Sequence, residues 1–354
     1  MRPHKLSFLL TATALVAAVG MTWTESSSAA ERVELGKLLF FDPVLSGSND
    51  LSCAHCHHPD LGFADGRGRA MGHGGIGFGP ERHGGVVLRR HTPSLWSVGE
   101  SHNLFWDGRA PNLEAQAREV LGHPQEMASD PEQLISELAA IGEYRHRFAR
   151  SFPGEEAVSM ENLVVALASF ERSLRADGTP FDRYLGGEIE ALSPSARRGW
   201  KLFLSPMTRC SECHVPPGFQ VPEFKVTGLP DQPGEAFDPG RGALVDHPFF
   251  RGAFKVPGLR NIALTRPYMH DGSLATLEDV IDFYASGRGR ERLAEGLFVD
   301  DFIQPFEIGD GDRADLVNFL ESLTDESRRP RIPHRVPSGL PVVAPLTCST
   351  DRLP

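Results

Sequence analysis

Two copies of the pattern Cys-x-x-Cys-His are the residues of this chain best suited to chemistry. They are Cys53, Cys56 and His57 in the first half and Cys210, Cys213 and His214 in the second. Two thiols one helical turn apart can reach the two vinyl groups on one edge of a porphyrin and form thioethers, and the adjacent histidine then ligates the iron. The spacing therefore predicts covalent attachment of two c-type haems.

Zinc ribbons and redox dithiols also use Cys-x-x-Cys pairs, but neither fits this chain. Zinc ribbons separate their pairs by about 15–20 residues, whereas the two pairs here lie 157 residues apart. A thioredoxin-like dithiol requires a strand–helix–strand context, and no such pattern surrounds either pair. The fifth cysteine, Cys348, lies in a Pro-rich tail and has no predicted role.

The segments that precede the two Cys pairs are alike. Residues 36–43 read Gly-Lys-Leu-Leu-Phe-Phe-Asp-Pro, and residues 199–206 read Gly-Trp-Lys-Leu-Phe-Leu-Ser-Pro. Each predicts a short amphipathic helix stopped by proline. We therefore expect a mainly α fold, with two cytochrome c-like haem domains related by duplication and joined by long loops.

Other elements must position these sites. Apolar residues at helical spacing predict helices over residues 132–152, 160–174 with Ser159 as N-cap, 276–284 and 312–323. The glycine-dense residues 62–92 predict a long ordered loop near a cofactor, and the Gly- and Pro-containing residues 177–195 predict the domain boundary.

The first thirty residues predict a secretory signal peptide, because a basic start is followed by an apolar run and a small-residue stretch. Removing 30 of the 354 residues leaves 324, enough for two domains. The predicted divisions are a signal peptide (1–30), an N-terminal haem domain (31–185), a C-terminal haem domain (186–328) and an extended Pro-rich tail (329–354).

The formal net charge of −11 argues against nucleic acid or an anionic lipid surface as partner. No segment after the signal peptide is apolar over the roughly 20 residues of a membrane span. We therefore expect a periplasmic protein without membrane insertion.

The chain resembles the bacterial di-haem cytochrome c peroxidase and MauG superfamily over most of residues 31–325. The resemblance rests on both haem motifs and on the stretches 35–40, 105–109, 126–127, 259–265 and 267–272. It implies that the N-terminal haem reacts with hydrogen peroxide and that the C-terminal haem is six-coordinate and handles electrons.

The same resemblance implies a role for three further residues. Glu126 corresponds to the distal acid and Gln116 to the distal amide of the peroxide pocket, where a carboxylate can move a proton between the two oxygens of peroxide. Trp106 corresponds to a tryptophan that relays electrons between the haems. Without the resemblance, Glu126 reads as a solvated acid and Trp106 as a core aromatic.

A histidine from a Gly-His-Gly stretch caps the open haem in those relatives that need activation. His73, in Met71-Gly72-His73-Gly74, resembles it loosely. The alternative is that His73 is an ordinary loop histidine.

The ligand opposite His214 distinguishes the branches of the family. The position fourteen residues after His270 is a methionine in the peroxidases and a tyrosine in MauG-like proteins, and here it is Tyr284. A tyrosinate stabilises higher iron states, whereas a thioether raises the potential. Met269 is the alternative ligand, and Tyr284 could also be a side chain of the apolar core that binds no iron.

The resemblance also implies a calcium ion between the domains, held in part by the stretch with Thr265 and Pro267. The side-chain ligand of the family is an asparagine, and here the position is His91, a poor ligand for a cation that prefers oxygen. A second departure is Thr208, which replaces the surface tryptophan through which MauG oxidises its substrate.

These residues favour a MauG-like enzyme, on a branch that includes MbnH-type proteins. It would use hydrogen peroxide to reach a high-valent di-haem state and oxidise a residue, tryptophan first, of a secreted partner protein. The alternative is a periplasmic cytochrome c peroxidase that takes electrons from a small cytochrome or cupredoxin. A third reading, an electron-transfer cytochrome without catalysis, conflicts with a distal pocket that contains Glu126 and Gln116.

Overall fold

The computed structural model describes residues 28–154 and 156–346. Most of the predicted signal peptide, and Cys348, lie outside these residues. The described chain is mainly helical, as the sequence predicts, and its only paired strands are two residues long. No helix within the described ranges has the length and apolar character needed to cross a bilayer.

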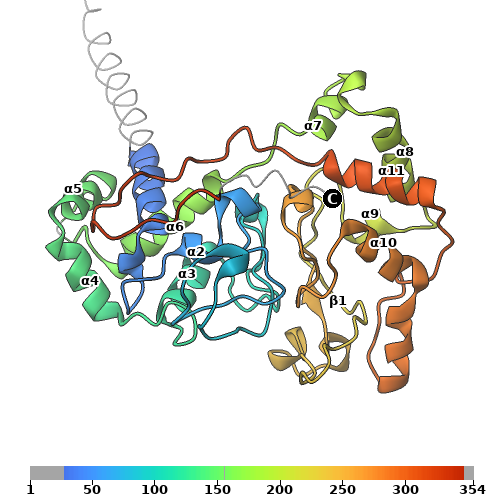
Figure 1. Cartoon of the computed structure of the whole chain (residues 1–354), viewed down its shortest axis with the longest axis horizontal. Helices are drawn as coiled ribbons and strands as arrows, with labels where there is room; N and C mark the ends of the chain where they lie inside the picture. Colours follow the sequence, from blue (N-terminus) through green and yellow to red (C-terminus); the bar gives the residue numbers. More distant parts are fainter. Residues whose placement is uncertain (1–27, 155, 347–354) are drawn as a thin grey trace, which may run out of the picture.

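The elements follow one another in two similar halves (Figure 1). A first helix, described from residue 28, ends at Phe41. The later α-helices are α2 (Cys53–Cys56), α3 (Leu113–Gly122), α4 (Pro131–Ala140), α5 (Gly142–Ser151), α6 (Met160–Ser173), α7 (Pro180–Leu185), α8 (Pro194–Phe203), α9 (Cys210–Cys213), α10 (Leu277–Ser286) and α11 (Asp310–Glu321). The antiparallel strands are β1 (Phe224–Lys225) and β2 (Phe254–Lys255). The 3-10 helices are η1 (Pro43–Leu45), η2 (Pro59–Leu61), η3 (Gly79–Glu81), η4 (Val98–Glu100), η5 (Ile189–Ala191), η6 (Arg241–Ala243), η7 (Pro248–Phe250), η8 (Ile262–Leu264) and η9 (Arg288–Glu295).

The same helix crossing occurs in both halves. A Cβ atom at Gly36 of the first helix would lie 1.9 Å from the carbonyl oxygen of Ala166 in α6, and one at Gly199 of α8 would lie 1.9 Å from that of Asp315 in α11. Only glycine lets the two backbones approach this closely. The repeated glycine that the sequence shows therefore marks the same contact twice.

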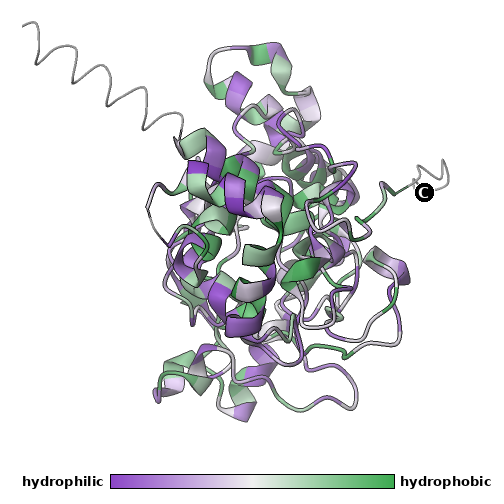
Figure 2. Cartoon of the chain, turned by 90° about the vertical axis from the view of Figure 1, so that its left-hand side faces the viewer, coloured by the Kyte–Doolittle hydropathy of each residue, from purple (hydrophilic) through white to green (hydrophobic). Residues whose placement is uncertain are grey.

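Each half has its own apolar core. The N-terminal cluster is formed by the first helix and by α3 to α6, with Phe40 and Phe170 at its centre. The C-terminal cluster joins α7, α8, α10 and α11 around Phe319. Purple and green residues alternate along the helices in Figure 2, as expected of amphipathic helices that bury one face.

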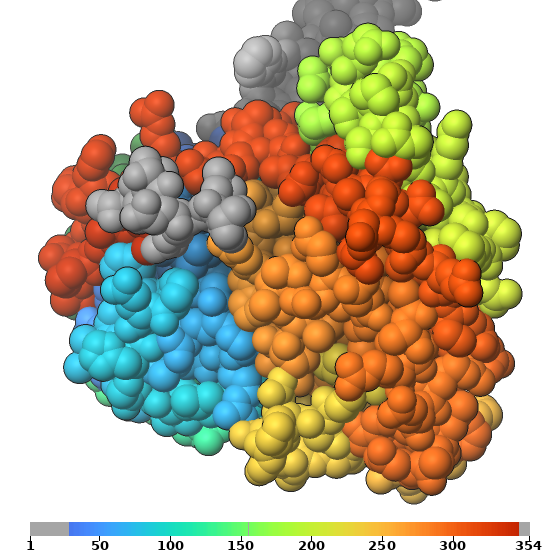
Figure 3. Space-filling view, turned by 45° about the vertical axis from the view of Figure 1, so that its right-hand side comes forward, coloured from blue at the N-terminus to red at the C-terminus, as the bar shows by residue number. Residues whose placement is uncertain are grey.

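The two halves abut directly, the blue and cyan surface against the orange one (Figure 3). At this contact a Cβ atom on Gly272, whose φ is +64°, would lie 2.4 Å from the Cα atom of Gly68. A Cβ atom on Gly62 would likewise lie 2.8 Å from the side chain of Thr265. The glycine-dense segment 62–92 is thus an ordered loop, as predicted, and it forms part of the interface.

Three of the four helices predicted from apolar spacing are confirmed, as α6, α10 and α11, and the fourth prediction is wrong. Ser159 caps α6 by accepting from the Asn162 amide, and Thr276 caps α10. The predicted helix 132–152 is instead two helices that meet at Ile141, whose backbone is extended. Arg145 donates to the carbonyl oxygens of Ala139 (2.6 Å) and Ala140 (3.0 Å), and so satisfies the end of α4 where the chain turns.

The Pro-rich tail is extended, as predicted, but it is not separate from the domains. Its described part, residues 329–346, which we call the C-terminal strap, runs from α11 back across the N-terminal half (Figure 1). Val336 and Val343 are buried in the N-terminal cluster. The hydroxyl of Ser338 donates to Asp42 at 2.6 Å. The strap therefore completes the N-terminal core.

Candidate haem sites

The first Cys pair occupies the single turn α2, which puts both sulfurs on one side. Ser52 caps this turn together with the side chain of His55, whose Nδ1 accepts from the Ser52 amide at 3.0 Å. Burial raises the pKa of the Cys56 thiol to about 12 and also raises the pKa of Cys53. Neither cysteine is in a disulfide, so both thiols remain available to form thioethers with the vinyl groups of a haem.

His57 is oriented by the chain that follows it. Its Nδ1 donates to the carbonyl oxygen of Phe63 at 2.9 Å, since a carbonyl can only accept. Burial lowers the pKa of His57 to about 4, so the ring is neutral and Nε2 keeps its lone pair. A hydrogen bond from the second ring nitrogen is the usual support of a metal-bound histidine.

The second site repeats this arrangement. Cys210 and Cys213 occupy the turn α9, and burial raises the pKa of Cys213 to about 11. His214 donates from Nδ1 to the carbonyl oxygen of Phe219 at 3.1 Å, and burial lowers its pKa. Phe219 and its counterpart Phe63 both have left-handed backbones, with φ of 54° and 58°.

These residues fit c-type haem at both sites. Each offers two thiols that are not in a disulfide and one buried neutral imidazole. Within the described ranges no three His, Cys, Asp or Glu side chains lie close enough to hold a metal ion by themselves. The two Cys pairs therefore do not combine into a shared zinc site.

Glu126 lies in the turn after α3. Its carboxylate oxygen is 3.8 Å from Nδ1 of His123, and its negative charge raises the pKa of the Cys56 thiol. Burial raises the pKa of Glu126, while His123 and Arg109 oppose that rise. The structure thus brings the predicted distal acid close to the first Cys pair.

Gln116 lies on α3, on the same stretch of chain as Glu126, and is half-buried. Within the described residues no hydrogen bond holds its side-chain amide. The amide is therefore available to a ligand.

The loop around His73 packs on the turn that contains Glu126. The amide of His73 donates to the carbonyl oxygen of Gln125 at 3.0 Å. Arg82, which the sequence did not single out, holds this loop by donating to the carbonyl oxygens of Met71 and Gly72, each at 2.9 Å. Nδ1 of His73 is buried without a partner among the described residues, so the capping role stays a prediction.

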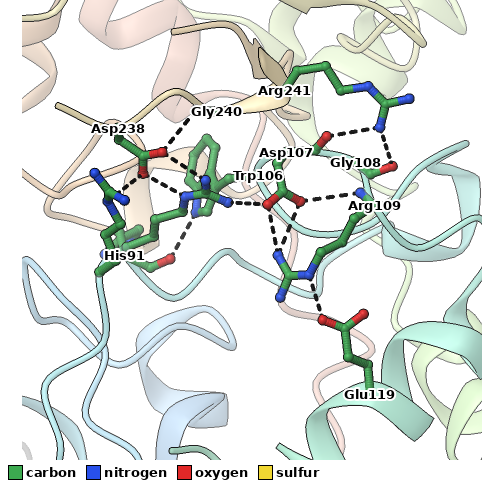
Figure 4. A network of polar contacts seen from close by, with 11 residues as sticks. His91, Trp106, Asp107, Gly108, Arg109, Glu119, Asp238, Gly240 and Arg241 are labelled. Carbon is green, nitrogen blue, oxygen red and sulfur yellow. Dashed lines mark hydrogen bonds and ion pairs between the residues drawn. The ribbon is translucent and has the colours of Figure 1, made fainter. Parts of the chain in front are cut away.

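Trp106 lies between the two halves (Figure 4). Its indole N–H donates to the carbonyl oxygen of His91 at 2.8 Å, and its ring meets that of His270 edge to face at 6.5 Å. The neighbouring Asp107 accepts from Arg90 at 2.6 Å, and Arg90 also binds Asp238 with two hydrogen bonds. An indole fixed in this way can serve as the link between two redox sites.

The network of Arg90, Asp107 and Asp238 was not found by sequence reasoning. Asp238 lies 148 residues after Arg90 in a Pro- and Gly-containing loop. No spacing rule pairs residues so far apart, and only the resemblance around Trp106 pointed to this region.

The phenol of Tyr284 lies near the second Cys pair. Burial raises the pKa of Tyr284, and Cys213 and Cys210 raise it further. No described residue forms a hydrogen bond with its hydroxyl. Met269 has a left-handed backbone, with φ of 76°, and packs on the C-terminal cluster, as Cys210 does.

The predicted calcium site does not fit calcium. The hydroxyl of Thr265 donates to the Ile262 carbonyl at 3.1 Å, and its own carbonyl faces the ring of His91. Nδ1 of His91 donates to the carbonyl oxygen of Arg67 at 2.7 Å. Calcium needs six to eight oxygens around an open centre, and here an imidazole fills the space between these carbonyls.

Comparison with known proteins agrees with this geometry. A family model described as di-haem cytochrome c peroxidase matches residues 30–190. The chain is 39% identical to the methylamine utilization protein MauG of Methylorubrum extorquens, over 84% of this chain and 79% of that protein. It is 33% identical to the cytochrome c551 peroxidase of Pseudomonas aeruginosa, over 85% and 80%.

Among solved structures, a MauG-like protein associated with microbial copper homeostasis superposes with a TM-score of 0.73 at 32% identity, covering 85% of this chain and 91% of that chain. The chain belongs to the family of di-haem cytochrome c peroxidases and MauG proteins. It is a di-haem enzyme of the peroxidase type, and two haem c groups are its cofactors. An electron-transfer cytochrome without catalysis is thereby excluded.

Proposed function

We propose that this enzyme is MauG-like and uses hydrogen peroxide to oxidise a residue, tryptophan in the first place, of a secreted partner protein. Peroxide takes up two electrons and two protons to give two molecules of water, and the partner residue supplies the electrons. The proposal assigns peroxide to the N-terminal half, with Cys53, Cys56 and His57, and the second redox site to the C-terminal half, with Cys210, Cys213 and His214, in the periplasm.

The proximity of Tyr284 to the second Cys pair carries this proposal. Both cysteines raise the pKa of the Tyr284 phenol, and no described group competes for its oxygen. If haem is bound at the second Cys pair, Tyr284 would give up its phenol proton to the solvent and hold the iron as a phenolate, a hard donor that favours oxidised iron and suits an enzyme that stores oxidising equivalents.

The bound haems supply the redox chemistry, with Cys53, Cys56 and His57 holding one and Cys210, Cys213 and His214 holding the other. The residues around them handle protons and position the reactants. Glu126 accepts a proton from the peroxide oxygen nearest to it and returns it to the departing oxygen, since burial keeps its proton affinity above that of an exposed glutamate. Gln116 orients peroxide through its free amide, and Trp106 links the two sites.

The path by which electrons pass from the partner protein to the haems must differ from the path in MauG. Thr208, two residues before Cys210, is buried, and its hydroxyl donates to the carbonyl oxygen of Leu202. A buried aliphatic hydroxyl cannot be oxidised as an indole can. We therefore propose that the partner protein docks elsewhere than beside residue 208.

A second candidate is a cytochrome c peroxidase that receives electrons from a small cytochrome or cupredoxin. The packing of Met269 on the same cluster as Cys210 favours it, because a thioether ligand raises the potential of the second haem. The similarity to the Pseudomonas aeruginosa peroxidase is consistent with either candidate.

Adding hydrogen peroxide to the fully ferric holoprotein distinguishes the two. Haem absorption and EPR are followed from the first milliseconds. A prompt change at both haems without prior reduction supports the MauG-like function. No reaction until one haem has been reduced contradicts it and favours the methionine-ligated peroxidase.

A further inference from the structure

His91 is the residue on which the two halves meet. It is buried, with 5% of its surface exposed, and lies at the end of the glycine-dense loop 62–92. We propose that its side chain replaces an interdomain calcium ion, so that this enzyme joins its two haem domains without calcium.

The imidazole of His91 lies between main-chain oxygens from both halves. Nδ1 donates to the carbonyl oxygen of Arg67, at 2.7 Å, in the N-terminal half. The carbonyl of Thr265, in the C-terminal half, also faces the ring. Carbonyl oxygens that converge from two domains are the ligands a calcium ion would use, and here both face one imidazole, which donates to one of them.

The main chain of His91 makes the same connection. Its amide donates to the carbonyl oxygen of His270 at 2.8 Å, and its carbonyl accepts from the Trp106 indole at 2.8 Å. The amide, the carbonyl and the ring are thus all engaged with groups that flank the interface.

Acidic groups surround the ring but do not complete a cation site. Asp65 is 1% exposed, and its carboxylate accepts from the Thr92 hydroxyl (2.9 Å) and from the Arg67 amide (3.0 Å). Asp271, in the C-terminal half, interacts electrostatically with the His91 ring, and its carboxylate accepts from the Ser273 amide at 3.1 Å. Each acid therefore already has a hydrogen-bond donor.

The halves approach closely on both sides of His91. Gly62 meets Thr265, and Gly68 meets Gly272, at distances that leave no room for a side chain. A flat ring fits between such backbones, whereas a calcium ion with its six to eight oxygens requires more room. The glycines and the histidine therefore form one consistent interface.

The test uses the holoprotein and measures calcium binding and stability rather than turnover. Calcium chloride is titrated into wild-type protein in a calorimeter, and thermal unfolding is recorded with EGTA and with excess calcium. We expect no stoichiometric binding and the same unfolding temperature in both buffers. Tight binding of one calcium ion, or a fall in unfolding temperature with EGTA, overturns the proposal.

The variant His91→Asn removes the ring and supplies a carbonyl oxygen in its place. Without calcium its unfolding temperature should fall by roughly 5 °C, as expected for the loss of a buried hydrogen bond and its packing. The control is His102→Asn, an exposed histidine, which should not change stability. An unchanged His91→Asn variant contradicts the proposal, and if the variant does not fold, the wild-type titrations decide.

Discussion

The indole N–H of Trp106 and the carbonyl oxygen of His91 are joined by a hydrogen bond of 2.8 Å. The bond connects the residue proposed to link the redox sites with the residue proposed to link the domains. Arg90, next to His91 in the chain, binds Asp107, next to Trp106. The position of the indole is therefore coupled to the contact between the halves (Figure 4).

Trp106→Phe should slow the response of the C-terminal haem to peroxide without abolishing the reaction at the N-terminal haem. Phenylalanine keeps the aromatic volume but loses the N–H donor and is far harder to oxidise. Rapid-mixing absorption spectroscopy separates the two responses. Trp96→Phe, at a buried tryptophan of the N-terminal core, is the control and should leave the ratio of the two rates unchanged.

Glu126→Gln should lower the rate of reaction with peroxide by roughly 10²–10⁴-fold, the usual contribution of a positioned acid–base group. In the wild type the carboxylate form is the active one. Because burial raises its pKa above 4.5, the rate should fall as the pH drops through a value above 4.5. This acid limb should be missing in the variant, and an unchanged pH profile would remove Glu126 from the mechanism. Glu132→Gln, at an exposed acid of α4, is the control.

Tyr284→Phe should change the absorption spectrum of the C-terminal haem and raise its reduction potential, because an anionic oxygen ligand is lost. Potentiometric titration followed by absorption measures both. Tyr184→Phe, at a half-buried tyrosine of α7, should change neither. If Met269→Leu produces the change and Tyr284→Phe does not, the thioether is the ligand.

Glu171, on α6, should make stability depend on pH. Burial raises its pKa from 4.5 to about 8, with Arg172 opposing, and its Oε2 has no partner among the described residues. The folded state therefore binds the proton more tightly than the unfolded state. Its contribution is greatest below pH 4.5 and is lost as the pH rises to about 8.

Chemical denaturation of wild type and Glu171→Gln over this pH range measures the effect. The variant should be nearly independent of pH where the wild type loses stability. Parallel curves for the two proteins would show that Glu171 does not titrate there.

Val336→Ala and Val343→Ala should each lower the free energy of unfolding by about 1.5 kcal/mol, because each removes two methyl-sized groups from the N-terminal core. Denaturant unfolding of the holoprotein measures the loss. Val87→Ala, at a valine that is 49% exposed, should cost much less. Equal losses in all three would mean that the C-terminal strap does not stabilise the core.

Local patterns predicted the elements that local forces determine. Ser159 and Thr276 accept hydrogen bonds from amides three residues later, so helix starts can be read from adjacent residues. The break at Ile141 could not be read in this way. It depends on Arg145 reaching back to the carbonyls of α4, a contact that the apolar periodicity does not record.

The site was predictable where spacing alone defines chemistry. The Cys-x-x-Cys-His motifs put thiols and imidazole on one turn, and the hydrogen bonds of His57 and His214 follow from the same local geometry. The contacts of Arg90 with Asp238 and of His91 with Arg67 depend instead on how distant loops meet. Sequence reasoning detected His91 only as a departure from an expected asparagine.

The C-terminal strap also bears on the order in which the chain can fold. Duplication gave two halves with matching helix crossings, yet they are not equivalent folding units. The C-terminal core contains residues up to Leu323, whereas the N-terminal core also needs Val336 and Val343. During synthesis, the half that is made first is therefore the last to receive all of its core residues.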